Sequence, residues 1–274
     1  RGMLNVPVIT VAFDNWTHEQ LINHARESIE TVEGKIDETV FTRLAERLSY
    51  VHGDFNDPKL YGKLKKALKG SHAATFYLEV PPSLFVIVAQ HLYNADLLHG
   101  DARVVFEKPF GTSYDTAVDL NRTLHSIMRE DQIFRLDHYL GKEPVQDVLY
   151  LRFGNTMFEP TWDNHYIDCI MITMSENFGV DDRGSFYDPV GTIRDVVQNH
   201  LLQVLALVTM EVPVADIAAP RLDIFKAMPD ADPAHVIRGQ YAGYQDVKGV
   251  RPNSTTETFV ALRLFINSWR WGGV

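Results

Sequence analysis

The chain has 274 residues, of which 45% are hydrophobic and 23% are charged, as in a globular protein with a substantial core. Its formal net charge of −10 argues against a general nucleic-acid or anionic-membrane binder, because such proteins present a basic surface. No stretch approaches the ~18 consecutive apolar residues of a membrane span, and no signal peptide is visible. The single cysteine, Cys169, excludes an internal disulfide, which fits a cytoplasmic protein.

The first half of the chain alternates between strand and helix patterns. Apolar runs rich in β-branched residues are typical of buried parallel strands, and they lie at residues 6–13, 73–80, 102–110 and 132–136. Apolar residues at helical spacing predict helices at 15–30, 37–51, 60–70, 81–98 and 115–131. Thr17 and Gln20 have the positions of an N-cap and its capping-box partner. This alternation predicts an α/β fold, a Rossmann-like doubly wound parallel sheet, over residues 1–135.

The pattern changes after about residue 135. Helices are expected from Pro144 to about Phe153 and from about 189 to 210. Strands are expected at residues 165–176, 234–244 and 256–269. Because strand and helix no longer alternate, residues 136–274 are predicted to form an α+β domain on a largely antiparallel sheet. Cys169 lies in the first of these strands, which predicts a small buried residue rather than a reactive thiol.

Polar side chains follow the predicted parallel strands, at the sheet edge where ligands bind in such folds. The richest of these segments is "LDHYLGKEPV", residues 136–145. Pro144 suits the first turn of a helix, whose free N–H groups and positive dipole end favour an anion. Lys142 adds a charge there, and His138 and Tyr139 add donors, so the segment predicts a phosphate site. A solvated turn is the alternative.

Two further residues are candidates by their position. Lys108, in "EKPFG", ends a buried strand before a proline and would point into the strand-end crevice; a charge leaving the sheet edge is the alternative. His200 lies on the apolar stripe of its helix with Ile193 and Val197, as a core histidine would. If a carboxylate such as Asp137 meets it, the imidazole becomes a general base. No metal-binding motif is present in the sequence.

Taken together, three segments resemble the glucose-6-phosphate dehydrogenase family: "EKPFG" at 107–111, "RLDHYLGKE" at 135–143 and "IRDVVQNHLLQVLALVTME" at 193–211. They occur in the family's order and at about its spacing, and the resemblance covers essentially the whole chain. It implies oxidation of the C1 hydroxyl of glucose 6-phosphate to 6-phosphogluconolactone, the first step of the oxidative pentose phosphate pathway. The hydride acceptor would be NADP, or NAD as in some members.

The resemblance also implies roles for individual residues. His200 would be the general base, and Asp137 its carboxylate partner. His138, Tyr139 and Lys142 would bind the substrate phosphate. Further contacts to the sugar would come from Lys108, Glu176 and Asp195, and contacts to the cofactor from Lys108, Asp14 and Pro82.

The chain departs from the family pattern at both ends. The family's glycine-rich loop, similar to GxxGDLA, should precede residue 1, and its "RxGKAL" segment should follow Val274. We therefore expect a partial chain that cannot turn over by itself. A homo-oligomer is expected when the protein is complete, since the family usually forms dimers or tetramers, with no nucleic-acid or membrane partner.

The choice between NADP and NAD stays open. Asp14 stands just after the strand at 6–13, where NADP-specific members of the family often place an arginine. A carboxylate at such a place can bond to a ribose 2′-hydroxyl and would repel a 2′-phosphate. NADP is the family default.

Two other functions remain as alternatives. A sugar dehydrogenase of the glucose–fructose oxidoreductase type shares the Glu-Lys-Pro motif but not "RLDHYLGKE". A non-catalytic paralogue would have no chemical reason to keep Asp137, His200 and Lys142 together.

Overall fold

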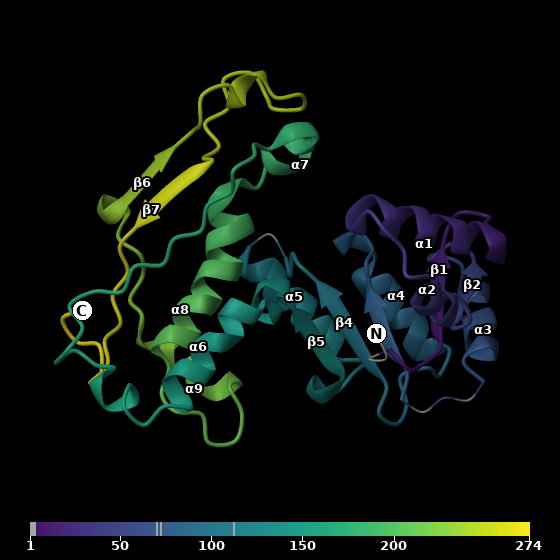
Figure 1. Ribbon diagram of the computed structural model, residues 1–274, viewed down its shortest axis with the longest axis horizontal. Helices are drawn as coiled ribbons and strands as arrows, with labels where there is room; N and C mark the ends of the chain where they lie inside the picture. Colours follow the sequence, from purple (N-terminus) through teal and green to yellow (C-terminus); the bar gives the residue numbers. More distant parts are fainter. Residues whose placement is uncertain (1–3, 70, 72, 112) are drawn as a thin grey trace. The chain divides into compact units, whose positions relative to one another are not determined.

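The computed structural model describes residues 4–69, 71, 73–111 and 113–274. The chain divides into two compact units, Arg1–Leu136 and Asp137–Val274. Colours from purple to teal in Figure 1 mark the first unit, and colours from teal to yellow mark the second.

In the first unit, the residues that the structure describes form two parallel β-sheets. β1 (Val8–Ala12) pairs with β2 (Leu48–His52). β4 (Arg103–Glu107) lies between β3 (Thr75–Leu78) and β5 (Ile133–Leu136). The described residues of this unit form the α-helices α1 (His18–Glu33), α2 (Glu38–Ala45), α3 (Pro58–Ala67), α4 (Phe85–Asn94) and α5 (Tyr114–His125). Helices therefore separate parallel strands along the chain, which confirms the predicted α/β class.

Local sequence signals account for several of these elements. The Thr17 side chain accepts a hydrogen bond from the backbone N–H of Gln20 at 3.2 Å, and the Gln20 side chain accepts one from the N–H of Thr17 at 2.8 Å. The predicted capping box is therefore confirmed at the start of α1. In the core, the fully buried ring of Phe85 on α4 meets the edge of Phe106 on β4, with centroids 5.4 Å apart.

The predicted helix over residues 37–51 is partly wrong. Helix α2 ends at Ala45, and Leu48–His52 forms strand β2. This segment pairs with the whole length of β1, which provides partners for its backbone hydrogen bonds. That pairing outweighs the helical spacing of its apolar residues. The helix predicted over 60–70 is confirmed as α3, although Gly70 lies outside the described residues.

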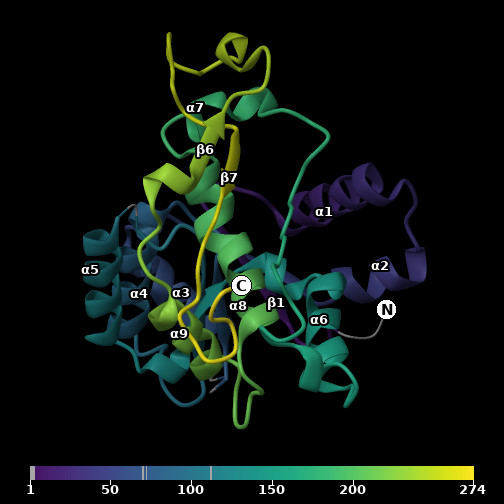
Figure 2. The ribbon, with the colours of Figure 1, turned by 90° about the vertical axis from the view of Figure 1, so that its left-hand side faces the viewer.

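The second unit is a group of helices with one small sheet. Its helical elements are α6 (Glu143–Phe153), α7 (Gly184–Tyr187), a π-helix over Ile193–Leu201, α8 (Leu202–Thr209) and α9 (Ala218–Ala227). β6 (Val236–Gly239) and β7 (Phe259–Leu262) form an antiparallel pair, which lies side by side in Figure 1 and Figure 2. The core beneath includes Ala206, Leu207 and Met210 of the α8 segment and Trp271 near the end of the chain.

Short 3-10 helices complete the described elements: η1 (Pro82–Leu84), η2 (Glu130–Gln132), η3 (His138–Gly141), η4 (Glu159–Thr161), η5 (Asp181–Arg183), η7 (Pro233–His235) and η8 (Tyr244–Asp246). Within the described ranges, no helix is both long enough and apolar enough to cross a membrane.

One predicted strand of the second unit is wrong. Residues 165–176 form no strand, although the strands predicted at 234–244 and 256–269 appear in shortened form as β6 and β7. A strand needs a neighbour for its backbone hydrogen bonds, and β6 and β7 pair with each other. Cys169, predicted to be buried in that strand, is consequently exposed.

Candidate active site

The central contact of the site joins Asp137 and His200. Nδ1 of His200 lies 2.6 Å from Oδ1 of Asp137, and the two side chains are only 6% and 13% exposed. A carboxylate at Nδ1 favours the tautomer that carries its proton there and leaves the lone pair on Nε2. The pair can therefore accept a proton at Nε2 and stabilise the imidazolium that forms.

The 3-10 helix η3, which follows β5, holds the carboxylate of Asp137 in place. This residue caps η3, where its Oδ1 also accepts a hydrogen bond from the backbone N–H of Tyr139 at 3.0 Å. The other oxygen, Oδ2, is buried and has no hydrogen-bond partner among the described residues. One carboxylate oxygen thus serves both the turn and the histidine.

His200 lies in the π-helix, which differs from the regular helix that the sequence predicts. Such wide turns are rare, and they often occur at functional sites. The Asn199 side chain donates to the backbone oxygens of Arg194, at 3.0 Å, and Asp195, at 3.4 Å, within this turn. The sequence signal that could have pointed to the turn is an asparagine inside a helix, since its side chain competes for backbone groups.

A carboxylate holds the first residue of the π-helix. The backbone N–H of Ile193 donates to Oε1 of Glu257 at 3.0 Å. Gly191 makes this approach feasible: its φ is +75°, and a Cβ there would lie 2.7 Å from the same carboxylate oxygen. A residue close to β7 therefore sets where the helix of His200 begins.

Aromatic rings surround the imidazole of His200. The Tyr139 ring stacks on it with centroids 5.0 Å apart, and the His138 ring meets it edge-on at 4.9 Å. Nζ of Lys142 lies 4.0 Å from the centroid of the Tyr139 ring. Lys142 is also the N-cap of α6, and its side chain makes no capping hydrogen bond. The helix therefore begins where the sequence predicts. The residues predicted to bind phosphate thus gather around the predicted base.

The two predicted acceptors for sugar hydroxyls lie in different surroundings. Asp195 is half-buried on the π-helix, five residues before His200, which is close to one turn of such a helix. Glu176 is exposed in the loop before α7. The structure therefore brings Asp195 to the helix of the base, whereas no contact between the described residues joins Glu176 to Asp137 or His200.

Three predicted ligands lie in the first unit, each just after a parallel strand. Asp14 is exposed after β1, and its backbone oxygen accepts a hydrogen bond from the Tyr50 hydroxyl at 2.5 Å. Pro82 begins η1 after β3, and the half-buried Lys108 follows β4 and precedes a cis peptide bond to Pro109. The carboxyl ends of parallel strands are where dinucleotides bind in open α/β sheets, so these positions fit a nucleotide.

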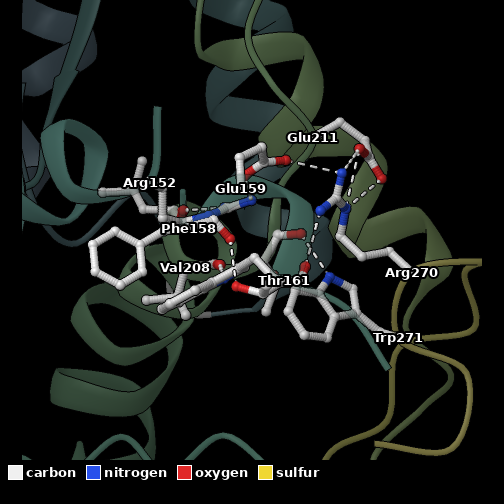
Figure 3. Close-up of polar contacts among 11 residues, drawn as sticks. Arg152, Phe158, Glu159, Thr161, Val208, Glu211, Arg270 and Trp271 are labelled. Atoms are coloured by element: carbon white, nitrogen blue, oxygen red, sulfur yellow. Dashed lines mark hydrogen bonds and ion pairs between the residues drawn. The ribbon is translucent and has the colours of Figure 1, made fainter. Parts of the chain in front are cut away.

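A second group of charges, which sequence reasoning missed, consists of the buried Arg152 and Arg270 with the more exposed Glu159 and Glu211; we call it the Arg152 cluster (Figure 3). Arg152 is fully buried and lies 3.2 Å from Glu159. Arg270 lies 3.0 Å from Glu159 and 2.7 Å from Glu211. Burial lowers the pKa of Arg152, and the attraction of Glu159 opposes this effect only in part. A hydrogen bond to Glu211 raises the pKa of Arg270. Each buried guanidinium therefore meets a carboxylate.

Side chains in and around the Arg152 cluster bind the last carbonyl groups of α8, the helix that continues from the π-helix of His200. The backbone oxygen of Leu207 accepts from Nη1 of Arg152 at 3.1 Å. The oxygens of the next two residues, Val208 and Thr209, accept from the indole N–H groups of Trp162, at 2.8 Å, and Trp271, at 2.7 Å. The last carbonyls of a helix lack partners inside it, so these side chains take their place.

Parallel strands separated by helices, followed by a unit with a buried carboxylate–histidine pair, are typical of nicotinamide-dependent dehydrogenases. Residues 3–147 match the family model "Glucose-6-phosphate dehydrogenase, NAD binding domain", and residues 149–274 match "Glucose-6-phosphate dehydrogenase, C-terminal domain". The chain therefore belongs to the glucose-6-phosphate dehydrogenase family, as its motifs predict, and its first unit is of the kind that binds a nicotinamide cofactor.

Individual relatives agree with the family models. Glucose-6-phosphate 1-dehydrogenase 1 of Mycobacterium tuberculosis is 51% identical over 276 residues, which cover 99% of this chain and 59% of the relative. The crystal structure of glucose-6-phosphate 1-dehydrogenase from Mycobacterium avium, also 51% identical, has a TM-score of 0.91 over 98% of this chain and 60% of that one. A glucose-6-phosphate dehydrogenase in complex with glucose 6-phosphate is 32% identical, with a TM-score of 0.89 over 97% of this chain and 59% of that one. The chain thus spans about three fifths of the length of these relatives.

Proposed function

We propose that the protein containing this chain is a glucose-6-phosphate dehydrogenase. It oxidises the C1 hydroxyl of glucose 6-phosphate to 6-phosphogluconolactone and passes the hydride to a nicotinamide cofactor. The observation that carries the proposal is the 2.6 Å contact between Asp137 and His200, in a chain of this family. Residues 1–135 form the cofactor domain and residues 136–274 the substrate domain.

His200 acts as the general base in this proposal. An alcohol can lose hydride from carbon only as its hydroxyl proton leaves, so a base must stand at the oxygen. Nε2 of His200 takes the C1 hydroxyl proton, and Asp137 stabilises the charge that the ring acquires. The burial of both side chains strengthens this attraction, because little water screens it.

The exposed face beside the base binds the substrate phosphate. His138, Tyr139 and Lys142 supply donors and positive charge for a dianion. Anchoring at the phosphate orients C1 toward His200, so that binding far from the reacting carbon contributes to the rate. Asp195 and Glu176 accept hydrogen bonds from sugar hydroxyls.

The cofactor domain holds the nucleotide through Asp14, Pro82 and Lys108, and Lys108 also contacts the sugar. When bound, the nicotinamide supplies the acceptor for the hydride. NADP is the proposed cofactor because the family favours it, and NAD is the alternative because Asp14 would repel a 2′-phosphate. The complete protein is proposed to be a cytoplasmic homo-oligomer; the single cysteine of this chain fits a reducing compartment.

Substrate comparison tests the proposal. The enzyme, built to the length of its relatives, is assayed for cofactor reduction with glucose 6-phosphate and with glucose, each with NADP and with NAD. We expect turnover with glucose 6-phosphate and a much lower kcat/KM with glucose. Equal rates with both sugars would favour an oxidoreductase of the glucose–fructose type, and no turnover with either would favour a non-catalytic paralogue.

A further inference from the structure

The carboxylate of Asp137 is incompletely satisfied by hydrogen bonds. Its Oδ1 takes both the His200 ring and the backbone N–H of Tyr139, while its buried Oδ2 has no hydrogen-bond partner among the described residues. A buried acceptor without a donor costs about 1–3 kcal/mol, and more when it is charged. A nearby positive charge can offset that cost.

Arg221 of α9 is held beside the helix that carries His200. Its Nη1 donates to Oε1 of Gln203 at 2.9 Å, and its Nε donates to the backbone oxygen of Ile217 at 3.1 Å. Gln203 follows His200 by three residues on the continuous helix, so the two side chains lie on the same side, one turn apart. Two hydrogen bonds thus fix a half-buried guanidinium next to the turn that follows the base.

The charges of Arg221 and Asp137 attract each other. Burial lowers the pKa of Arg221, and the attraction of Asp137, followed by that of Asp216, opposes this effect. Arginine nevertheless remains protonated in proteins, so its charge is permanent. A fixed cation therefore acts on the carboxylate that orients the histidine.

We propose that Arg221 is a positioning residue for the reaction: its permanent charge, held beside the turn that follows His200, disfavours the imidazolium, so that the ring stands ready to accept a proton. The inference rests on the proposed function, in which His200 is the base. Arg221 does not touch the substrate in this proposal; it acts through the pair of Asp137 and His200.

The charged and titratable groups around His200 determine the direction in which its titration shifts when Arg221 is removed. His138 and Tyr139 face His200 from η3, and Asp195 precedes it on the same helix. The exposed Lys142 adds a positive charge 4.0 Å from the centroid of the Tyr139 ring, and the half-buried Arg221 adds one beside the helix of the base. A nearby cation disfavours the protonated, positively charged imidazole of His200. Its removal therefore raises the pH at which the imidazole loses its proton.

Three variants of the enzyme, built to the length of its relatives, test the proposal through the pH profile of kcat/KM. Arg221→Gln should shift the acid limb upward by about 0.5–1 pH unit, which lowers kcat/KM ~3–10-fold on that limb. Arg221→Lys should restore most of the original profile. Lys226→Gln removes an exposed cation of the same helix that pairs with Asp223, and it should leave the profile unchanged.

An unmoved acid limb in Arg221→Gln, with a lowered Tm alone, would overturn the proposal. If that variant does not fold, Gln203→Met frees the guanidinium from its anchor; a smaller upward shift is expected, and an unchanged profile would again contradict the role. NMR titration of the His200 ring separates this inference from the proposed function. An enzyme without turnover whose His200 ring still titrates higher in Arg221→Gln would refute the function and retain the electrostatic role.

Discussion

Two groups of charges in the second unit, each with buried members, differ in the chemistry of their side chains. The Arg152 cluster combines two guanidiniums with two carboxylates, whose charges stay constant near neutral pH. The pair of Asp137 and His200 combines a carboxylate with an imidazole, which gains and loses its proton in that range. Both groups contain buried charges, so burial alone does not identify a site of chemistry. The pair of Asp137 and His200 is distinguished by a member that can exchange a proton near neutral pH.

One continuous helix connects the two groups. His200 lies in its π-helical part, and the carbonyls at its far end bind side chains of Arg152, Trp162 and Trp271. We infer that one end of the helix serves the reaction and the other serves stability. Substitutions at the two ends should therefore separate the rate of turnover from the free energy of unfolding.

The largest effect is expected from His200→Asn. Loss of a general base lowers kcat by about 10²–10⁴-fold, while the amide keeps a donor for Asp137 and the fold survives. Steady-state kinetics and circular dichroism of the enzyme, built to the length of its relatives, would check this. Turnover close to that of the unmodified enzyme would remove His200 from the role of base.

Arg152→Leu should act on stability instead. It leaves Glu159 buried with one partner fewer, and breaking a buried pair from one side costs about 3–5 kcal/mol. Denaturant unfolding would measure the loss, and the exposed pair of Arg122 and Asp119 offers a control, Arg122→Leu, with an expected loss below about 1 kcal/mol. If kcat of the folded Arg152→Leu enzyme fell as far as that of His200→Asn, the division of roles would be wrong.

Lys142→Ala should weaken substrate binding with little effect on folding, because the side chain is exposed. Loss of one charge-assisted contact to the phosphate corresponds to about 1.5–3 kcal/mol, or a KM for glucose 6-phosphate raised ~10–100-fold, with kcat nearly kept. Glucose, which lacks the phosphate, should show no such change. An unaltered KM for glucose 6-phosphate would argue against phosphate binding at Lys142.

The smallest effects are expected from Trp162→Phe and Trp271→Phe. Each change removes an indole N–H from a carbonyl at the end of α8, at a cost of about 1 kcal/mol, and keeps most of the ring packing. Thermal unfolding would measure each loss against Trp269→Phe, since Trp269 is 70% exposed. A loss for the control as large as for the two variants would contradict the capping role.

Much of the fold and the centre of the site could be predicted because their signals are local. The capping box of Thr17 and the start of α6 at Lys142 depend on residues a few positions apart. The meeting of Asp137 and His200, 63 residues apart, was a conditional hypothesis from pattern, and the family resemblance made it specific. The predictions for residues 48–51 and for Cys169 are wrong, since strand pairing and burial depend on neighbours that are distant in the chain.

The amino-acid sequence alone predicts the alternation of strands and helices in the first unit, the family, and the residues proposed for chemistry. Periodicity, caps and motifs act within a few residues, so they can be recognised along the chain. Three features become visible in the folded chain alone. The helix of His200 begins as a π-helix whose first residue is held by Glu257, Arg221 lies beside that helix, and Arg152 binds a carbonyl at its far end. Glu257 and Arg152 contact that helix, and Arg270 contacts Glu211 just after it, across more than 50 positions of the chain in each case. No local pattern reports such contacts, because folding alone brings their partners together.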